Sequence, residues 1–194
     1  MQTESIPGYT YGAVGRSPIS MDAFDRMKRA ALFGPDDEKA LQTSYDIVSK
    51  HADEILDGWY GFIASQPQLL ATFSNPRNGK PDQHYLDAVR ERFRVWIFDT
   101  AKANYDQNWL DYQHEIGLRH RDKKNQTDQV EVMSVVPFRY LFPLVYPVTA
   151  TLKPFLERGG HSKEDVERMH GAWVKSVLLQ LTLWSYPYID PTSY

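Results

Sequence analysis

The stretch YDQNWLDYQHEIGLRH, residues 105–120, decides the fold class of this chain. Asp106 is a favourable helix N-cap, because its carboxylate can accept hydrogen bonds from the free N–H groups of the first turn. At about 100° per residue, Ile116 and His120 lie within about 20° of Trp109 around the helix axis. The segment therefore predicts an amphipathic helix with an imidazole on its apolar face, in the last turn.

The same helical period extends through the chain on both sides of this segment. Ser20 and Ser162 are N-cap candidates for the first and last helices. Pro35 followed by three acidic residues is a further start signal, since proline and carboxylates both suit the first turn. That helical period continues to Ile63, and we expect a kink near Gly58 and Gly61. The sequence predicts an all-α fold of seven or eight helices with short connections.

Residues 138–156 are apolar on nearly every side. We interpret them as a central helix, bent at Pro143 and Pro147. In the last helix, Leu178, Leu179 and Leu183 lie outside the arc of the main apolar stripe. A second apolar face needs a second partner, and this predicts a homodimer through the last helices.

The composition excludes several classes of protein. The chain has 194 residues, 42% of them apolar and 24% charged, which indicates one globular domain over residues 1–194. A net charge of −3 lacks the general basic field that nucleic-acid binding needs. The absence of cysteine excludes disulfide frameworks, cysteine-ligated zinc, iron–sulfur clusters and thiolate nucleophiles.

No apolar run approaches the roughly 18 residues of a membrane span, and the start of the chain has no signal-peptide core. We therefore expect a soluble, cytoplasmic protein that does not interact with membranes. Residues 1–20 are rich in glycine and proline but also carry Ile6, Tyr9 and Tyr11. They predict an irregular N-terminal arm that lies against the domain.

His120 is the most informative candidate for chemistry. A buried imidazole at a helix end suits an axial haem ligand, and no thiolate is present to take that role. A core histidine hydrogen-bonded to a carbonyl is the alternative. His170, close to the apolar stripe of the last helix, is a competing ligand on pattern alone.

Other residues suggest a pocket or a rim. The aromatic fraction of 13% exceeds what packing of a helical bundle needs, and Trp59 and Tyr60 share one apolar arc. Arg92 lies on an apolar stripe, where it either reaches solvent or meets an anion such as a haem propionate. The Asp111–His114 and Glu167–His170 pairs have the spacing of a di-iron motif, but we interpret them as solvated surface charges. Residues 122–128 predict a solvated loop.

Six segments together carry a resemblance to a known family: IPGYTYG (6–12), ILDGWYGFIAS (55–65), YDQNWLDYQHEIGLRH (105–120), KKNQTD (123–128), YPVTATLKPFL (146–156) and LWSYPY (183–188). The chain resembles archaeal protoglobin over essentially its full length. The resemblance implies an expanded globin fold, a sandwich of three helices over three, with an extra N-terminal helix and the arm. It also implies haem b held by His120, and a homodimer.

The resemblance also implies residues for the cofactor site. The distal side would be built from Trp59, Tyr60 and Phe93, with Tyr60 as hydrogen-bond donor and no distal histidine. From the apolar stripes and the resemblance together, the predicted cofactor-binding residues are His120, Trp59, Tyr60, Phe73, Arg92, Phe93, Tyr112, Ile116, Arg119, Leu141, Leu144 and Val148. Two positions depart from the family pattern: Arg121 replaces a second histidine, and Leu144 replaces a phenylalanine.

Two functional classes remain open for such a haem-binding globin. The first is a protein that reversibly binds dioxygen, carbon monoxide and nitric oxide, for gas binding or sensing. The second is a haem enzyme that uses an open distal site for peroxide or carbene-transfer chemistry. Turnover with peroxide or a carbene donor would distinguish them.

Overall fold

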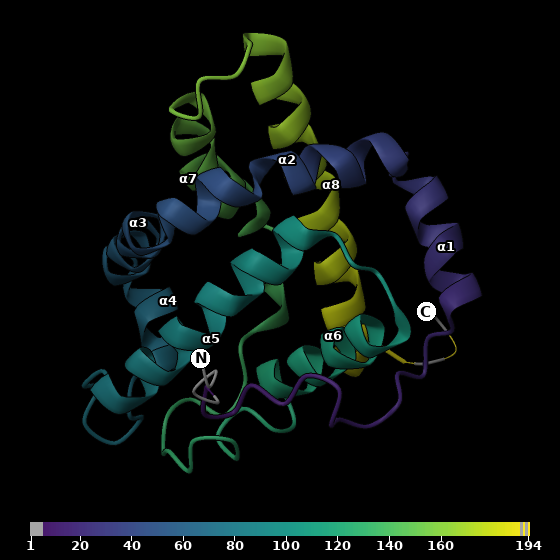
Figure 1. Ribbon diagram of the computed structural model, residues 1–194. Coiled ribbons are helices and arrows are strands. Elements are labelled where there is room, and N and C mark those ends of the chain that lie inside the picture. The colour runs from purple at the N-terminus through teal and green to yellow at the C-terminus, as the bar shows by residue number, and fades with distance from the viewer. Residues whose placement is uncertain (1–5, 191, 193) are drawn as a thin grey trace.

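Helices make up the framework of the described chain, and Figure 1 follows them from end to end. The computed structural model describes residues 6–190, 192 and 194; residues 1–5 of the predicted arm lie outside this set. The described residues form eight α-helices and no strand, as the sequence predicted. These are α1 (Met21–Ala30), α2 (Pro35–Lys50), α3 (Ala52–Ala64), α4 (Pro67–Leu70), α5 (Gln83–Lys102), α6 (Gln107–His120), α7 (Val145–Glu157) and α8 (Lys163–Ser185), with three short 3-10 helices, η1 (Ala71–Phe73), η2 (Phe138–Tyr140) and η3 (Tyr186–Tyr188).

Side-chain caps begin the helices at the predicted positions. The Ser20 hydroxyl accepts from the Ala23 amide, and Ser162 accepts from Asp165. The Asp106 carboxylate accepts from the Trp109 amide at 2.8 Å. Each cap satisfies an N–H group that the first turn of a helix leaves free.

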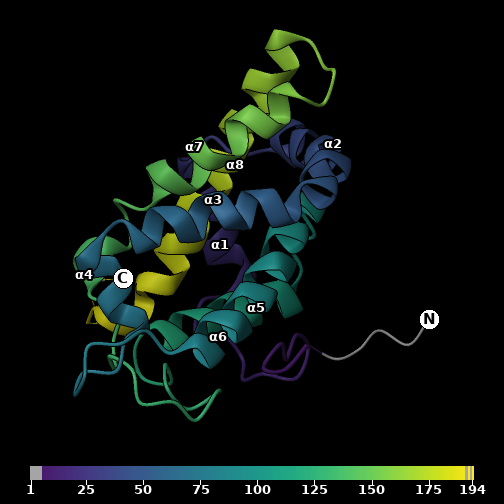
Figure 2. The ribbon, with the colours of Figure 1, turned by 90° about the vertical axis from the view of Figure 1, so that its left-hand side faces the viewer.

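The six longer helices form two layers of three. Figure 2 shows α2, α5 and α6 on one side and α3, α7 and α8 on the other. Between the layers, α8 packs against both α2 and α6. The helix α1 and the described part of the arm precede this sandwich, so the expected arrangement of three helices over three is confirmed.

The break after α2 lies at His51, not at the glycines where a kink was expected. His51 has φ −108° and ψ 15°, outside the helical region, and it separates α2 from α3. Gly58 lies inside α3, and a Cβ there would make only an ordinary van der Waals contact, 3.4 Å from Cγ2 of Thr151 on α7.

The prediction of one bent, central helix over 138–156 was wrong. The chain forms the 3-10 helix η2 and a turn before α7 begins at Val145. Pro143 disfavours helical dihedrals in the residue before it, whereas Pro147 falls in the first turn, where its missing N–H is not needed. The segment is central on one side only: Leu141, Leu152 and Leu156 belong to the core, whereas Phe138 is 43% exposed and Tyr146 79% exposed.

The three leucines of the last helix do not share one exposed face. Leu179 and Leu183 are buried inside the chain's own core, and only Leu178, 40% exposed, faces outward. Of the three leucines that were expected to form a second apolar face, only Leu178 is therefore available for an interface.

The described part of the arm lies along α5 and α6 (Figure 1). The Tyr9 hydroxyl donates to the Asp99 carboxylate, and the Ser17 amide donates to Asp111 Oδ1 at 2.8 Å. Gly8 has φ +76°, and a Cβ there would lie 2.6 Å from Cγ2 of Thr127. This tight turn of the arm thus requires glycine for both its backbone conformation and its close packing.

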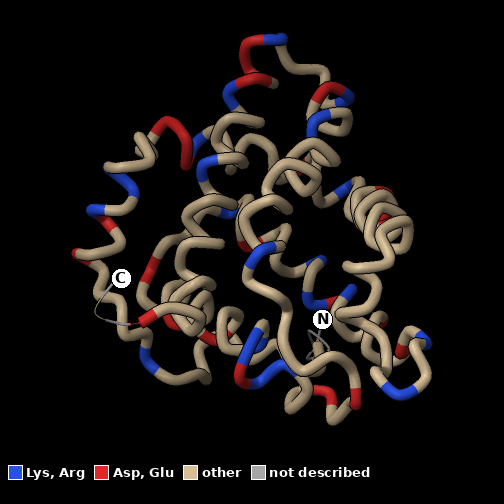
Figure 3. Tube along the Cα trace, turned by 180° about the vertical axis from the view of Figure 1, so that it is seen from behind, with Lys and Arg blue, Asp and Glu red and all other residues tan. Residues whose placement is uncertain are grey.

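Charged residues of both signs alternate along the chain on the face shown in Figure 3, without a continuous basic stripe on that face. None of the helices in the described part of the chain has the length and apolar character needed to cross a membrane.

Candidate functional site

A large cavity of about 250 Å³ opens between the two helical layers. A space of about 15 Å³ would hold one water molecule, so this cavity has room for a much larger ligand. Its walls come from α3, η1, α5, α6, α7 and α8 and are mostly apolar. All twelve site residues suggested by the sequence line it: Trp59, Tyr60, Phe73, Arg92, Phe93, Tyr112, Ile116, Arg119, His120, Leu141, Leu144 and Val148.

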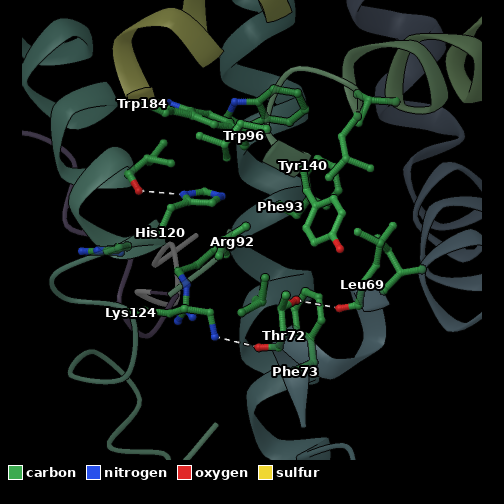
Figure 4. A pocket seen from close by; sticks show the side chains of 18 of the residues that line it. Leu69, Thr72, Phe73, Arg92, Phe93, Trp96, His120, Lys124, Tyr140 and Trp184 are labelled. Carbon is green, nitrogen blue, oxygen red and sulfur yellow. Dashed lines mark hydrogen bonds between the residues drawn. The ribbon is translucent and has the colours of Figure 1, made fainter. Parts of the chain in front are cut away.

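His120 is the only histidine among the described residues that line the cavity. Figure 4 shows its ring pointing from α6 across the cavity toward Phe93 and Tyr140. Its Nδ1 lies 2.8 Å from the Ile116 carbonyl oxygen, one helical turn back. An imidazole that donates from Nδ1 to a carbonyl presents an unprotonated Nε2, the arrangement that metal-binding histidines use.

The environment also keeps this imidazole neutral. Burial lowers the pKa of His120 below its ordinary value, and the nearby Lys124 ammonium lowers the pKa further. The hydrogen bond to the Ile116 carbonyl opposes this shift only in part. A neutral ring with a free lone pair can coordinate a metal, whereas a protonated ring cannot.

The wall facing His120 is aromatic. Trp59 on α3 meets Phe93 on α5 edge to face, with ring centroids 5.9 Å apart. Tyr60, the next residue of α3, packs edge to face on Phe73. These rings make an apolar, water-excluding distal wall.

The Tyr60 hydroxyl is buried and has no hydrogen-bond partner among the described residues. Burial raises its pKa well above the ordinary value, so the phenol remains protonated. A buried hydroxyl without a partner costs on the order of 1–3 kcal/mol. A polar ligand atom in the cavity would satisfy this donor.

Two arginines form a polar rim where the arm crosses the cavity. Arg92 makes two hydrogen bonds to the Asp128 carboxylate, at 2.9 and 2.6 Å, and one to the Pro7 carbonyl at 3.1 Å. Arg119 pairs with Glu115 and donates to Thr10 Oγ1 at 2.9 Å and to the Gly8 carbonyl. The rim therefore joins the cavity to the arm.

The loop at 122–128 is not wholly solvated, which corrects the sequence prediction. Lys124 is only 4% exposed and lines the cavity, with its Nζ donating to the Thr72 carbonyl at 2.7 Å (Figure 4). Its ammonium lies over the Tyr85 ring, 4.8 Å from the centroid. Burial lowers the pKa of Lys124 to about 8.

Sequence reasoning also missed Tyr140 and Trp184 as cavity residues. Trp184 belongs to the apolar stripe of α8, but a stripe does not tell which of its members faces a cavity. Nothing in the sequence indicated that Lys124 lines the cavity, since a lysine in a charged loop is normally solvated. Its burial depends on a tertiary contact with η1.

The remaining histidine candidates lie elsewhere. His170 does not line the cavity, and His114, expected to face solvent, packs edge to face against Tyr186. Within the described ranges, no three His, Asp or Glu side chains gather as a metal site. Among these residues, neither the Asp111–His114 pair nor the Glu167–His170 pair is part of such a group.

Two layers of three helices around an apolar cavity are the arrangement of the globin fold. The globin domain of the Geobacter sulfurreducens globin-coupled sensor has this fold, with a TM-score of 0.65 and 14% sequence identity. The alignment covers 86% of this chain and 97% of that chain.

Residues 20–194 match the Protoglobin family model. The chain belongs to the protoglobin family. This membership implies a haem cofactor and small gas ligands, in agreement with a cavity that presents one neutral imidazole.

Proposed function

We propose that this protein binds haem b in the described cavity through Nε2 of His120 and binds dioxygen, carbon monoxide and nitric oxide reversibly, for gas binding or sensing. The observation that carries this proposal is the imidazole itself. Its Nδ1 is held by the Ile116 carbonyl, its Nε2 is directed into the cavity, and burial lowers its pKa, which favours the neutral ring.

The other residues of the cavity fit a porphyrin. Its apolar face would lie against Ile116, Leu141 and Val148, all cavity-lining side chains. Its carboxylates would meet the rim, where Arg92 and Arg119 supply guanidinium groups. When bound, haem supplies the metal centre that coordinates a diatomic gas.

The distal residues would then select and hold the gas ligand. Trp59 and Phe93 exclude water from the wall opposite His120. Tyr60 would donate its unpaired hydrogen bond to a polar diatomic ligand. Leu144 also lines the distal part of the cavity, where its side chain affects the room left for a ligand.

A haem enzyme acting on peroxide or a carbene donor is the other candidate. Peroxide chemistry benefits from an acid–base group beside the reacting oxygen atoms. The distal wall of Trp59, Tyr60 and Phe93 carries no carboxylate or histidine. This composition favours reversible gas binding.

We also propose that the protein is a homodimer that pairs through its last helices. Four exposed apolar side chains support this assembly: Phe138, Phe142, Tyr146 and Leu178. Tyr146 lies on α7 and Leu178 on α8, two helices that pack against each other, and Phe138 and Phe142 lie shortly before α7. An exposed apolar surface of this kind is commonly covered by a second copy of the chain.

The functional test is a haemin titration of the purified apo-protein followed by absorption spectra in the oxidised, reduced and carbon monoxide-treated states. We expect stoichiometric haem uptake and a carbon monoxide complex that reverts to the reduced spectrum when the gas is removed. Failure to take up haem would refute the proposal, and turnover of peroxide or a carbene donor at high rate would favour the enzyme alternative.

A further inference from the structure

The end of α8 and the 3-10 helix η3 lie against the proximal histidine, although the haem-binding proposal assigns them no role. The Trp184 indole stacks on the His120 imidazole, with ring centroids 5.1 Å apart and an interplanar angle of 19°. Figure 4 shows the indole over the imidazole, on the α8 side of the cavity. A flat ring lying parallel to the imidazole restricts rotation of that ring about its side-chain bonds.

The indole is itself held in place by a buried partner. Its Nε1 donates to Oε1 of Gln113 at 2.8 Å, and Gln113 is only 2% exposed. Gln113 lies on α6, seven residues before His120. The indole of Trp184 on α8 thus contacts α6 twice, through Gln113 and through the His120 imidazole.

The backbone of His120 is fixed from the same side. The Tyr188 hydroxyl lies 2.9 Å from the His120 carbonyl oxygen and 2.8 Å from that of Val136. The Val136 amide also donates to the His120 carbonyl at 2.8 Å. These contacts hold the last residue of α6 where a helix end would otherwise fray.

A close helix crossing makes the stacking possible. A Cβ on Gly117 would lie 3.0 Å from Cα of Trp184 and 3.1 Å from its carbonyl oxygen. A glycine at this position therefore lets α8 come near enough to bring the indole over the imidazole.

We propose that Trp184 is a positioning residue that sets the plane of the His120 imidazole, with Gln113 anchoring the indole and Tyr188 anchoring the His120 backbone. This inference rests on the proposed role of His120 as haem ligand. Groups that orient a metal-binding histidine typically change metal affinity by about 10–100-fold when removed.

The test compares Trp184→Leu and Trp184→Phe with the parent protein, first without haem and then loaded with haem. In the apo-protein, NMR of the histidine rings should show the His120 protons shifted upfield by the indole. Trp184→Leu should lose that shift, and Trp184→Phe should retain part of it. A His120→Gln variant identifies the signals.

In the haem-loaded protein, resonance Raman spectroscopy measures the iron–histidine stretching band. We expect Trp184→Leu to shift this band and to release haem to an acceptor protein about ten-fold faster. Trp184→Phe should lie closer to the parent, because phenylalanine keeps a flat ring. Tyr188→Phe should speed haem release, with Tyr186→Phe in the same 3-10 helix as its matched control.

Trp173→Phe is the control for a merely structural effect, since Trp173 is a buried tryptophan whose Nε1 donates to Ser44. It should lower stability without moving the iron–histidine band. An unmoved band in both Trp184 variants, in a parent that binds haem through His120, would overturn the inference. If the parent takes up no haem, the proposed function fails instead, and the apo-protein spectra still report whether the rings stack.

Discussion

One ring nitrogen, Nε2 of His120, carries most of the chemistry inferred for this protein. Its availability depends on the Ile116 carbonyl, which accepts from Nδ1, and on burial, which lowers the pKa of the ring. Neither effect needs a charged partner. The buried Lys124 ammonium, which lines the same cavity, further favours the neutral form of the ring.

Tyr60 is the residue expected to contact the gas ligand. Its buried hydroxyl lacks a partner among the described residues. A hydrogen bond to a charged group contributes about 1.5–3 kcal/mol, and about 1.4 kcal/mol changes a rate ten-fold. Tyr60→Phe should therefore speed dioxygen dissociation by about ten-fold or more, measured by stopped-flow displacement with carbon monoxide.

The matched control is Tyr105→Phe, which removes a buried hydroxyl that is paired with Ser176 Oγ at 2.9 Å, away from the cavity. It should leave the dissociation rate unchanged. Equal rates in Tyr60→Phe and the parent would show that the Tyr60 hydroxyl does not reach the ligand.

Lys124 makes a pH-dependent contribution to stability. Its pKa is about 8 in the folded chain, below the ordinary value of 10.5. Between these two values the unfolded state binds more protons, so stability rises with pH. Over pH 8 to 10 the rise from this group is about 2 kcal/mol, since one pKa unit corresponds to about 1.36 kcal/mol.

Lys124→Met removes this titration. Urea unfolding of the apo-protein at pH 8, 9 and 10 should show the parent gaining about 2 kcal/mol relative to Lys124→Met across the range. Parallel pH profiles for the two proteins would mean that the ammonium is not desolvated in the folded state.

At the scale of helices, the crossing of α6 and α8 depends on one glycine. A Cβ at Gly117 would come within 3.1 Å of two backbone atoms of Trp184, which cannot move without shifting α8. Gly117→Ala should destabilise the protein by about 1–3 kcal/mol, as overpacked core positions do. Thermal or urea unfolding measures this loss.

Gly171 is a matched control, because it lies inside α8 and a Cβ there would meet no described atom of another element within 4 Å. Gly171→Ala should stabilise the protein by about 0.5–1 kcal/mol through helix propensity. If both alanine variants gain stability, the close crossing at Gly117 is not a constraint.

Local chemistry made the helix starts predictable. Ser20, Asp106 and Ser162 each cap the helix that the sequence assigned to them. The break at His51 was not predictable, because its neighbours continue the apolar period of one long helix. Propensity favoured a break at Gly58, whereas α3 continues through that glycine to Ala64.

At the scale of the whole molecule, the cavity brings together residues more than 80 positions apart, from Trp59 to Val148. Periodicity identified the apolar faces but could not show which of them meet. Periodicity and the family resemblance together named twelve of the residues that meet there. They did not supply Lys124 and Trp184, whose positions depend on tertiary contacts with Thr72 and Gln113.

Assembly is a further prediction at this scale. Leu178 is 40% exposed on α8, so Leu178→Glu would place a charge in the proposed interface. We expect a dimer for the parent and a monomer for the variant in light scattering at micromolar concentration, with the haem spectrum nearly unchanged. A monomeric parent would contradict the proposed homodimer.

The central claim is that His120 holds the haem iron, and a pair of alanine variants tests it most directly. Haemin titration of His120→Ala should show no stable haem complex unless imidazole is added, whereas His170→Ala should bind haem as the parent does. Added imidazole restores the missing ligand and shows that the cavity itself is intact. Stable haem binding by His120→Ala, together with its loss in His170→Ala, would contradict the claim.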